Sequence, residues 1–192
     1  MHDARVANCE VKIPPAVLLL LLTLLYGCAP APERELPDRD VFEAALSHFA
    51  RRQDTYSLAE DGVILVAPST LSNNEVALDG TDEGRCENLG RFVASFAERN
   101  EKSRPTAEFV PDSPRWRIAT EKEAEASLYQ LDSNTIKTRI TASTPAYSSD
   151  RSHALVHFWF LWSEHGASAV YVLANDGQGR WAVECNHVEF RL

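Results

Sequence analysis

Four segments rich in β-branched and aromatic residues dominate the C-terminal part of the chain and constrain its fold more than any other feature. They cover residues 136–143, 153–162, 168–174 and 181–190. Turn-forming residues separate them at 148–150, 164–166 and 175–179. Strands joined by connections this short pair with their neighbours in antiparallel fashion. The sequence therefore predicts an antiparallel meander sheet of about four strands.

An amphipathic helix is the first element expected after residue 37. Asp40 and Glu43 resemble a capping box at its start. Apolar residues then recur at helical spacing through about Gln53, namely Phe42, Ala45, Leu46 and Phe49. A short apolar run at 62–68, closed by a proline, predicts a strand or extended segment after this helix.

Two further helices are expected between this strand and the meander. A periodic segment at 83–102 places one set of side chains on a single helix face: Cys86, Leu89, Val93, Phe96 and Asn100. Thr120 and Glu123 form another capping-box pattern, which predicts a short helix to about Gln130. Because helices precede strands, the sequence predicts an α+β fold in which N-terminal helices pack on one face of the C-terminal sheet.

An uncharged, leucine-rich run at residues 16–27 marks a targeting segment. A helix that spans a bilayer needs about 20 apolar residues, whereas the apolar region of a secretory signal has about 7 to 15. The run ends in Leu25, Tyr26, Gly27 and Cys28, an order that resembles the lipobox of bacterial lipoproteins. The alternatives are a buried core helix and a short membrane anchor that is never cleaved.

The lipobox resemblance implies a domain organisation and a location. Residues 1–27 would be a lipoprotein signal peptide, and Cys28 would become the acylated first residue, with palmitate-type chains, of an exported protein. Residues 28–37 would form a tether, and residues 38–192 a single α+β domain. Ala29 after the cysteine resembles the pattern that directs lipoproteins to the outer membrane, facing the periplasm, in Gram-negative cells.

The remaining cysteines predict a disulfide bond. Loss of Cys9 with the leader and acylation of Cys28 would leave Cys86 and Cys185 in an oxidising compartment, where disulfides persist. Their bond would close a loop of about 100 residues and contribute on the order of 4 kcal/mol in the chain-entropy model. The alternative is a pair of buried free thiols that pack as small apolar residues.

The charge of the chain excludes one class of partner. It has 19 Lys and Arg against 28 Asp and Glu, a net charge of −9. Proteins that bind nucleic acid through its phosphates need clustered positive charge, and the sequence contains no such cluster. We therefore expect no nucleic-acid partner.

The sequence contains no recognisable catalytic or metal motif. His153 and His157 would share a metal only on a helix, because four residues along a strand separate them by about 13 Å. A serine hydrolase motif of the GxSxG type is missing. We therefore predict no catalytic residue, no metal and no cofactor, and we favour a non-enzymatic protein while leaving enzymatic activity open.

Part of the chain resembles a family of uncharacterised bacterial secreted proteins and lipoproteins. The resemblance covers about residues 86–184. Its matching residues are Phe96-Ala97-Glu98-Arg99-Asn100, Ala146-Tyr147-Ser148-Ser149-Asp150, Ala154-Leu155-Val156, Leu173 and Gly179-Arg180-Trp181-Ala182-Val183. These are mostly core and turn residues, so the resemblance implies a fold and no particular activity.

An unusually apolar strand supplies the candidate binding face. Phe158, Trp159, Phe160 and Trp162 lie in a segment that is apolar on both sides, whereas one face of an antiparallel sheet is usually wetted. Either helices cover both sides, or one side is a patch for a partner. The leading hypothesis is therefore a membrane-anchored module that binds an envelope protein or another envelope component through this strand.

A pocket is the alternative to a binding face. His157, Glu184 and His187 could line a cavity on a curved sheet of the NTF2-like or cystatin-like kind. The protein would then be an envelope enzyme or a binder of small ligands. Dispersal of these three residues over separate places would argue against it.

Overall fold

The computed structural model describes the chain from residue 37 onward, in the ranges 37–51, 62–73, 86–126, 131, 136–162 and 165–191. The chain divides into two compact units, Met1–Leu36 and Pro37–Leu192, and the described residues belong to the second. The predicted signal peptide, Cys28 and most of the tether therefore lie outside the described residues. Within these ranges, no helix has the length and apolar character needed to cross a bilayer.

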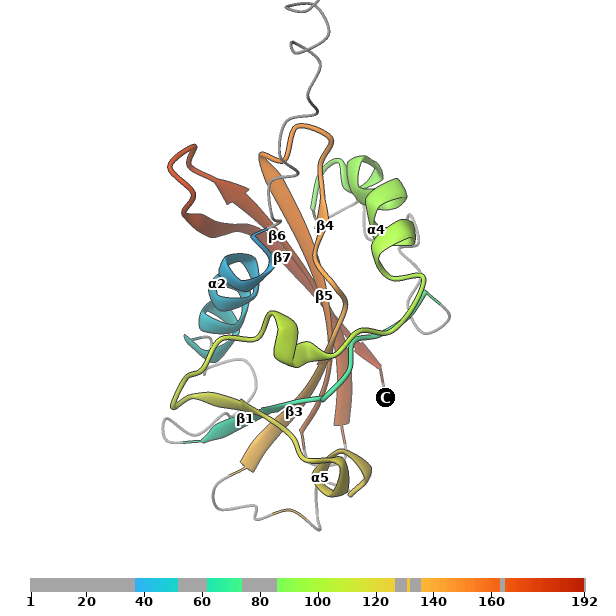
Figure 1. Ribbon diagram of the computed structural model, residues 1–192, viewed down its shortest axis with the longest axis vertical. Coiled ribbons are helices and arrows are strands. Elements are labelled where there is room, and N and C mark those ends of the chain that lie inside the picture. Colours follow the sequence, from blue (N-terminus) through green and yellow to red (C-terminus); the bar gives the residue numbers. More distant parts are fainter. Residues whose placement is uncertain are drawn as a thin grey trace, which may run out of the picture. The chain divides into compact units, whose positions relative to one another are not determined.

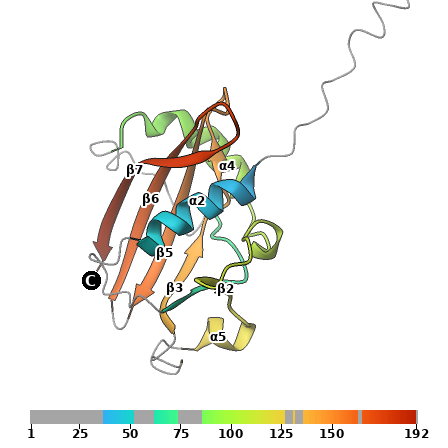
Figure 2. The ribbon, with the colours of Figure 1, turned by 90° about the vertical axis from the view of Figure 1, so that its left-hand side faces the viewer.

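A single mixed sheet forms the centre of the domain (Figures 1 and 2). In the described part of the chain it contains β1 (Val63–Val66), β2 (Trp116–Ile118), β3 (Ile136–Ala142), β4 (Ala146–Tyr147), β5 (His153–Trp162), β6 (His165–Asn175) and β7 (Trp181–Arg191). Their order is β2-β1-β3-β5-β6-β7, and β4 also pairs with β5. The α+β class is confirmed.

The sheet is larger than the predicted one. Its antiparallel part, β3-β5-β6-β7, is the expected meander. The sheet nevertheless has seven strands where about four were predicted, because β1 and β2 extend it in parallel and β4 adds a short antiparallel pair. The strand expected at 62–68 is β1, and it lies between β2 and β3 with Ile64, Leu65 and Val66 all buried.

The hairpin loop between β6 and β7 is built as its sequence indicates. Gly177 and Gly179 have φ values of 80° and 90°, which residues with a Cβ rarely adopt. The side-chain oxygen of Asn175 accepts hydrogen bonds from the backbone N–H groups of both glycines. The carboxylate of Asp176 accepts from the backbone of Gln178, so the loop is held by its own side chains.

Helix α5 (Glu121–Glu125) begins at its expected start, whereas α2 (Asp38–Arg51) begins before Asp40, which therefore lies inside the helix and not at its cap. Helix α5 has a true capping box, in which the Thr120 hydroxyl accepts from the Glu123 backbone and the Glu123 carboxylate accepts from the Thr120 backbone. The Arg117 guanidinium donates to the Glu123 carboxylate, and this bond, followed by the one from the Thr120 backbone, lowers the pKa of Glu123 to about 2. The expected ends at Gln53 and Gln130 lie outside the described residues.

The helix predicted at 83–102 is much shorter in the structure. It consists of a 3-10 turn, η2 (Leu89–Phe92), followed by α4 (Val93–Arg99). Residues 86–88 form a turn before it, and Asn88 has a left-handed backbone with φ of 64°. A left-handed residue interrupts helical geometry, so the periodic pattern overestimated the length of this helix. A second 3-10 turn, η3 (Thr106–Glu108), lies in the proline-containing segment expected to be irregular.

The front face of the sheet, defined here as the face that carries Phe158, Phe160 and Tyr171, is covered by α2. The ring centroids of Phe49 and Phe160 are 5.0 Å apart, and those of Phe158 and Tyr171 are 5.1 Å apart. Phe42 of α2 lies 6.2 Å from Phe158 by the same measure. These aromatic side chains form the larger part of the core against α2.

The back face is covered by η2 and α4. Leu155, Val170 and Val172 of the sheet pack with apolar side chains of that layer, which are Cys86, Leu89, Phe92 and Phe96. Leu155 and Phe158 are separated by an odd number of positions on one strand, so they point to opposite faces. Figure 1 accordingly shows α2 and α4 on opposite sides of the sheet. The prediction that helices pack on one face only was wrong.

A group of polar residues holds α2, α4 and the sheet together. Asp38, the first residue of α2, forms an ion pair of 2.6 Å with Arg99 of α4 and accepts a 2.8 Å hydrogen bond from the Tyr147 hydroxyl. Asn100 is buried, and its side chain bonds the backbone of Thr144 through both its oxygen and its nitrogen. These residues therefore join α2, α4 and the sheet, as structural parts of the fold.

Candidate functional site

The aromatic strand does not present all of its rings to the surface. Phe158 and Phe160 have 0% exposed surface, because Phe42 and Phe49 of α2 lie against them. They are core residues, and their assignment to the candidate binding face is corrected here. The side chain of Trp162 is outside the described part of the chain.

Trp159 lies on the back face, beyond the part that α4 covers. Both it and Leu161 are half-buried. Gly166 of β6 pairs with Leu161, and a Cβ atom at this glycine would be 3.1 Å from Leu161 Cδ2 and 3.3 Å from Trp159 Cζ2. The Trp159 and Leu161 side chains therefore occupy the space above Gly166 that the side chain of any other residue would need. Trp159, Leu161 and Gly166 are called the Trp159 strip below.

Polar groups border the Trp159 strip on both sides. Trp159 pairs with Ser168 of β6, and Ser168 pairs in turn with the exposed Glu189 of β7. On the other side, Arg139 of β3 pairs with Leu161 and donates to carbonyl groups of Glu123, Ala124 and Ala126 at the end of α5. The strip is thus an apolar surface with a polar rim.

The three polar residues predicted to share a pocket lie in different places. His157 pairs with Val170 of β6, which pairs with His187 of β7, so one strand separates the two histidines by about 10 Å. His157 is 7% exposed, and its backbone N–H donates to the Ser143 hydroxyl. Glu184 lies closer to the disulfide, where it lines a cavity that neither His157 nor His187 lines.

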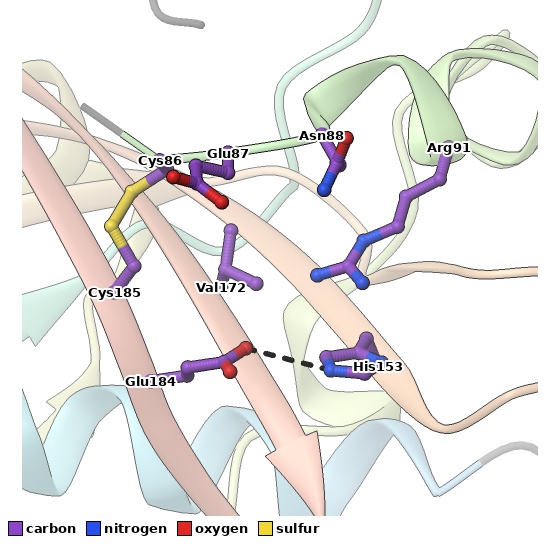
Figure 3. A pocket seen from close by; sticks show the side chains of 8 residues that line it. All are labelled: Cys86, Glu87, Asn88, Arg91, His153, Val172, Glu184 and Cys185. Atoms are coloured by element: carbon purple, nitrogen blue, oxygen red, sulfur yellow. Dashed lines mark ion pairs between the residues drawn. A yellow bond between two sulfur atoms is a disulfide. The ribbon is translucent and has the colours of Figure 1, made fainter. Parts of the chain in front are cut away.

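This cavity has a volume of about 280 Å³ and lies at the predicted disulfide (Figure 3). Cys86 and Cys185 are bonded, with their Cα atoms 5.8 Å apart, which confirms the predicted pair. The bond joins the turn before η2 to β7 on the back face. The lining residues are Cys86, Glu87, Asn88, Arg91, His153, Val172, Glu184 and Cys185.

A β-bulge in β7 brings Glu184 into the cavity. Val172 pairs with Cys185 and Leu173 pairs with Val183, so Glu184 is the extra residue between them. A bulge changes the direction of a side chain, and here Glu184 and Cys185 both line the cavity. The carboxylate of Glu184 lies 3.5 Å from Nε2 of His153, the first residue of β5.

The turn before β5 fixes the other side of His153. Its Nδ1 atom is 2.7 Å from the Ser152 hydroxyl, which also contacts the Asp150 carboxylate at 2.8 Å. Hydrogen bonds from Ser148 and Ser152 hold the pKa of Asp150 well below its usual range. Asp150 therefore stays ionised and accepts a hydrogen bond from the Ser152 hydroxyl, which in turn contacts His153.

Sequence reasoning missed most of this cavity. It considered His153 only as a possible metal partner of His157 and rejected that role because both residues were expected on a strand. They do lie on one strand, β5, but the contacts of His153 with Glu184 and Ser152 were not foreseen. The usable signal was the cysteine pair, because Glu87 follows Cys86 and Glu184 precedes Cys185. Arg91 and the bulge left no recognisable pattern.

The described residues offer no group of three His, Cys, Asp or Glu side chains able to hold a metal ion. The described residues instead form an apolar strip with a polar rim and a cavity that carries charges of both signs. Neither a protein-family model, nor a curated protein, nor a solved structure matches this chain.

Proposed function

We propose that this protein is an exported lipoprotein whose domain acts as a non-enzymatic binding module of the cell envelope. The lipobox-like residues at 25–28 support export and acylation of Cys28. Two or more acyl chains on that cysteine would anchor the protein stably, where one chain is marginal. The location is the periplasmic side of the outer membrane if the host is Gram-negative.

The Trp159 strip is the proposed binding surface, and its half-buried apolar side chains are the observation that carries the proposal. Trp159 and Leu161 retain exposed surface although they belong to the central antiparallel part of the sheet. Tryptophan is enriched at the centre of protein interfaces, where a surrounding polar rim excludes water. Arg139 and Glu189 lie at such a rim, so the strip has the composition of an interaction site for an envelope component.

Capture of partners from detergent-solubilised membranes tests the strip. Substitutions Trp159→Ala and Leu161→Ser should each reduce capture of the partner that the parent protein retains. Val93→Ala is the matched control, because Val93 of α4 is an exposed apolar residue, 50% exposed, away from the strip. Unchanged capture by the Trp159 variant, with its fold retained, would contradict this function.

Membrane fractionation tests the anchor separately. A Cys28→Ala variant cannot be acylated at that position, so we expect it to leave the membrane fraction. The Cys9→Ala variant serves as the control, because Cys9 lies in the predicted leader. Unchanged fractionation of the Cys28 variant would refute lipidation without affecting the argument for the strip.

The pocket alternative draws little support from its original residues. His157, Glu184 and His187 share the back face, and Glu184 lines the described cavity beside the disulfide, whereas His157 and His187 do not line that cavity. A curved sheet with a pocket of these three groups therefore remains a prediction that is not part of the proposal.

A further inference from the structure

The cavity beside the disulfide carries separated charges of both signs. Glu87 and Glu184 bring carboxylates to it, and Arg91 of η2 brings a guanidinium group. In Figure 3 the guanidinium and the two carboxylates lie on different sides of the cavity. A pocket of this kind is suited to a ligand that itself carries both charges.

Arg91 is available to a ligand in the cavity. Among the described residues, no carboxylate lies within ion-pair distance of its guanidinium, which lies 4.8 Å from the centre of the Phe92 ring. That stacking contact leaves the N–H groups at the edge of the guanidinium free to donate. Figure 3 shows the guanidinium pointing into the space between Asn88 and His153. A guanidinium can bind a carboxylate through two parallel hydrogen bonds.

The two carboxylates differ in their partners. Glu184 contacts His153, which compensates its charge only when the imidazole is protonated. Glu87 forms no ion pair with a described residue, and it is exposed. Together they offer acceptors for an ammonium group on the side of the cavity near the disulfide (Figure 3).

Val172 and the disulfide supply the apolar part of the lining. Val172 of β6 lies between the charged groups in Figure 3, and the disulfide closes one side. Because the disulfide fixes Cys86 to β7, the positions of Glu87 and Glu184 are tied to each other across the sheet and its covering layer. A ligand would find its polar partners largely preformed, which lowers the entropic cost of binding.

We propose that this cavity binds a small zwitterion, of the class of free amino acids and dipeptides. The ligand carboxylate lies against Arg91 and Asn88, and its ammonium group lies between Glu87 and Glu184. A short apolar side chain contacts Val172 and the disulfide. The volume of about 280 Å³ is at the low end of ligand pockets, which typically have about 300 to 1,000 Å³, and it suits a ligand of this small size.

Isothermal titration calorimetry on the full chain with its disulfide intact tests this inference. The probes are L-alanine, L-valine and L-alanyl-L-alanine, compared with N-acetyl-L-alanine, which lacks the ammonium group, and L-alanine amide, which lacks the carboxylate. We expect at least one zwitterion to bind, and each blocked analogue of alanine to bind about tenfold more weakly or not at all. Absence of heat from all three zwitterions, or equal binding of the blocked forms, overturns the inference.

Two substitutions assign the binding to this cavity. Arg91→Gln and Glu184→Gln should each weaken zwitterion binding by about tenfold, while thermal unfolding stays that of the parent, because both side chains are exposed. Arg51→Gln is the control, since this exposed arginine lies at the end of α2 and outside the cavity. Binding that the Arg91 and Glu184 substitutions leave unchanged overturns the assignment. The strip proposed for the envelope partner is untouched by these variants, so the two proposals fail independently.

Discussion

The two faces of the sheet are covered by different means. On the front face, the continuous helix α2 (14 residues) packs Phe42 and Phe49 onto aromatic side chains of β5 and β6. On the back face, η2 and α4 have 4 and 7 residues and are fastened to β7 by the disulfide. The front cover thus depends on aromatic burial, and the back cover on apolar packing reinforced by a covalent bond.

This difference accounts for where candidate sites occur. A long helix buries Phe158 and Phe160 of β5 completely, whereas the short back cover leaves Trp159 and Leu161 half-buried. The charged cavity also lies in the back cover, at the turn that the disulfide fixes. Both proposed sites therefore belong to the face whose cover is short.

The largest expected effect comes from removing a ring of the front core. Phe158→Ala should lower the free energy of unfolding by about 3 to 5 kcal/mol, because it leaves a cavity beneath α2. Urea unfolding followed by circular dichroism measures the loss. A loss as small as that of an exposed residue would break the comparison between the faces.

Removal of the disulfide is the corresponding change on the back face. The double variant Cys86→Ala/Cys185→Ala should lose about 2 to 5 kcal/mol, since its unfolded chain gains the freedom of a loop of about 100 residues. Unfolding curves of parent and variant, with and without reductant, should coincide only when the parent is reduced. A parent that is insensitive to reductant would contradict the role given to this bond.

A smaller effect is expected at the joint between the two covers. Tyr147→Phe removes the hydroxyl that donates to Asp38, which should cost about 1.5 to 3 kcal/mol, the usual contribution of a hydrogen bond to a charged group. Arg99 remains paired with Asp38 in this variant, so the domain should still fold. Urea unfolding at neutral pH measures the difference.

The same joint predicts a dependence on alkaline pH. Burial, and then the charge of Asp38 and the hydrogen bond to it, raise the pKa of Tyr147 far above its ordinary value. The folded protein therefore holds the phenol proton more tightly than the unfolded chain, and this contribution is complete below about pH 10 and decreases as the pH rises further. Above that pH the parent should lose stability more steeply than Tyr147→Phe, and parallel profiles would contradict the assignment.

The smallest loss of stability is expected at Trp159, which follows Phe158 in the sequence but lies on the back face. Trp159→Ala removes a larger side chain than Phe158→Ala, yet it should cost only about 1 to 2 kcal/mol, because the indole is half-buried. Thermal unfolding of the two variants under one condition gives the comparison directly. Equal losses would mean that Trp159 is a core residue and not part of an open strip.

Local patterns predicted a large part of this fold. The capping box at Thr120 and the hairpin at 175–179 follow from short-range chemistry, and both are present. Helix α2 occurs where apolar spacing predicted a helix, but it begins at Asp38, so Asp40 lies inside it and does not cap it. The pairing of Cys86 with Cys185 followed from counting, because only two cysteines remain after the assumed processing.

Features that depend on tertiary contacts were not predictable in this way. Strand β2 has only three residues, which is too short to show the alternation of apolar and polar residues that reveals a strand. The second helix was overestimated because Asn88 adopts a left-handed backbone that the apolar spacing does not reveal. Glu184 reaches the cavity through a bulge, whose position depends on the register of β6 and β7.

Hydroxyl-radical footprinting of β5 tests the asymmetry of the two faces most directly. Oxidation of Trp159, Phe158 and Phe160 is read by mass spectrometry, and each rate is divided by the rate of the same residue in the urea-unfolded chain. We predict substantial oxidation of Trp159 in the folded protein and strong protection of both phenylalanines beneath α2. Equal protection of all three residues, or oxidation of the phenylalanines, would contradict a strand whose front face is closed and whose back face is partly open at Trp159.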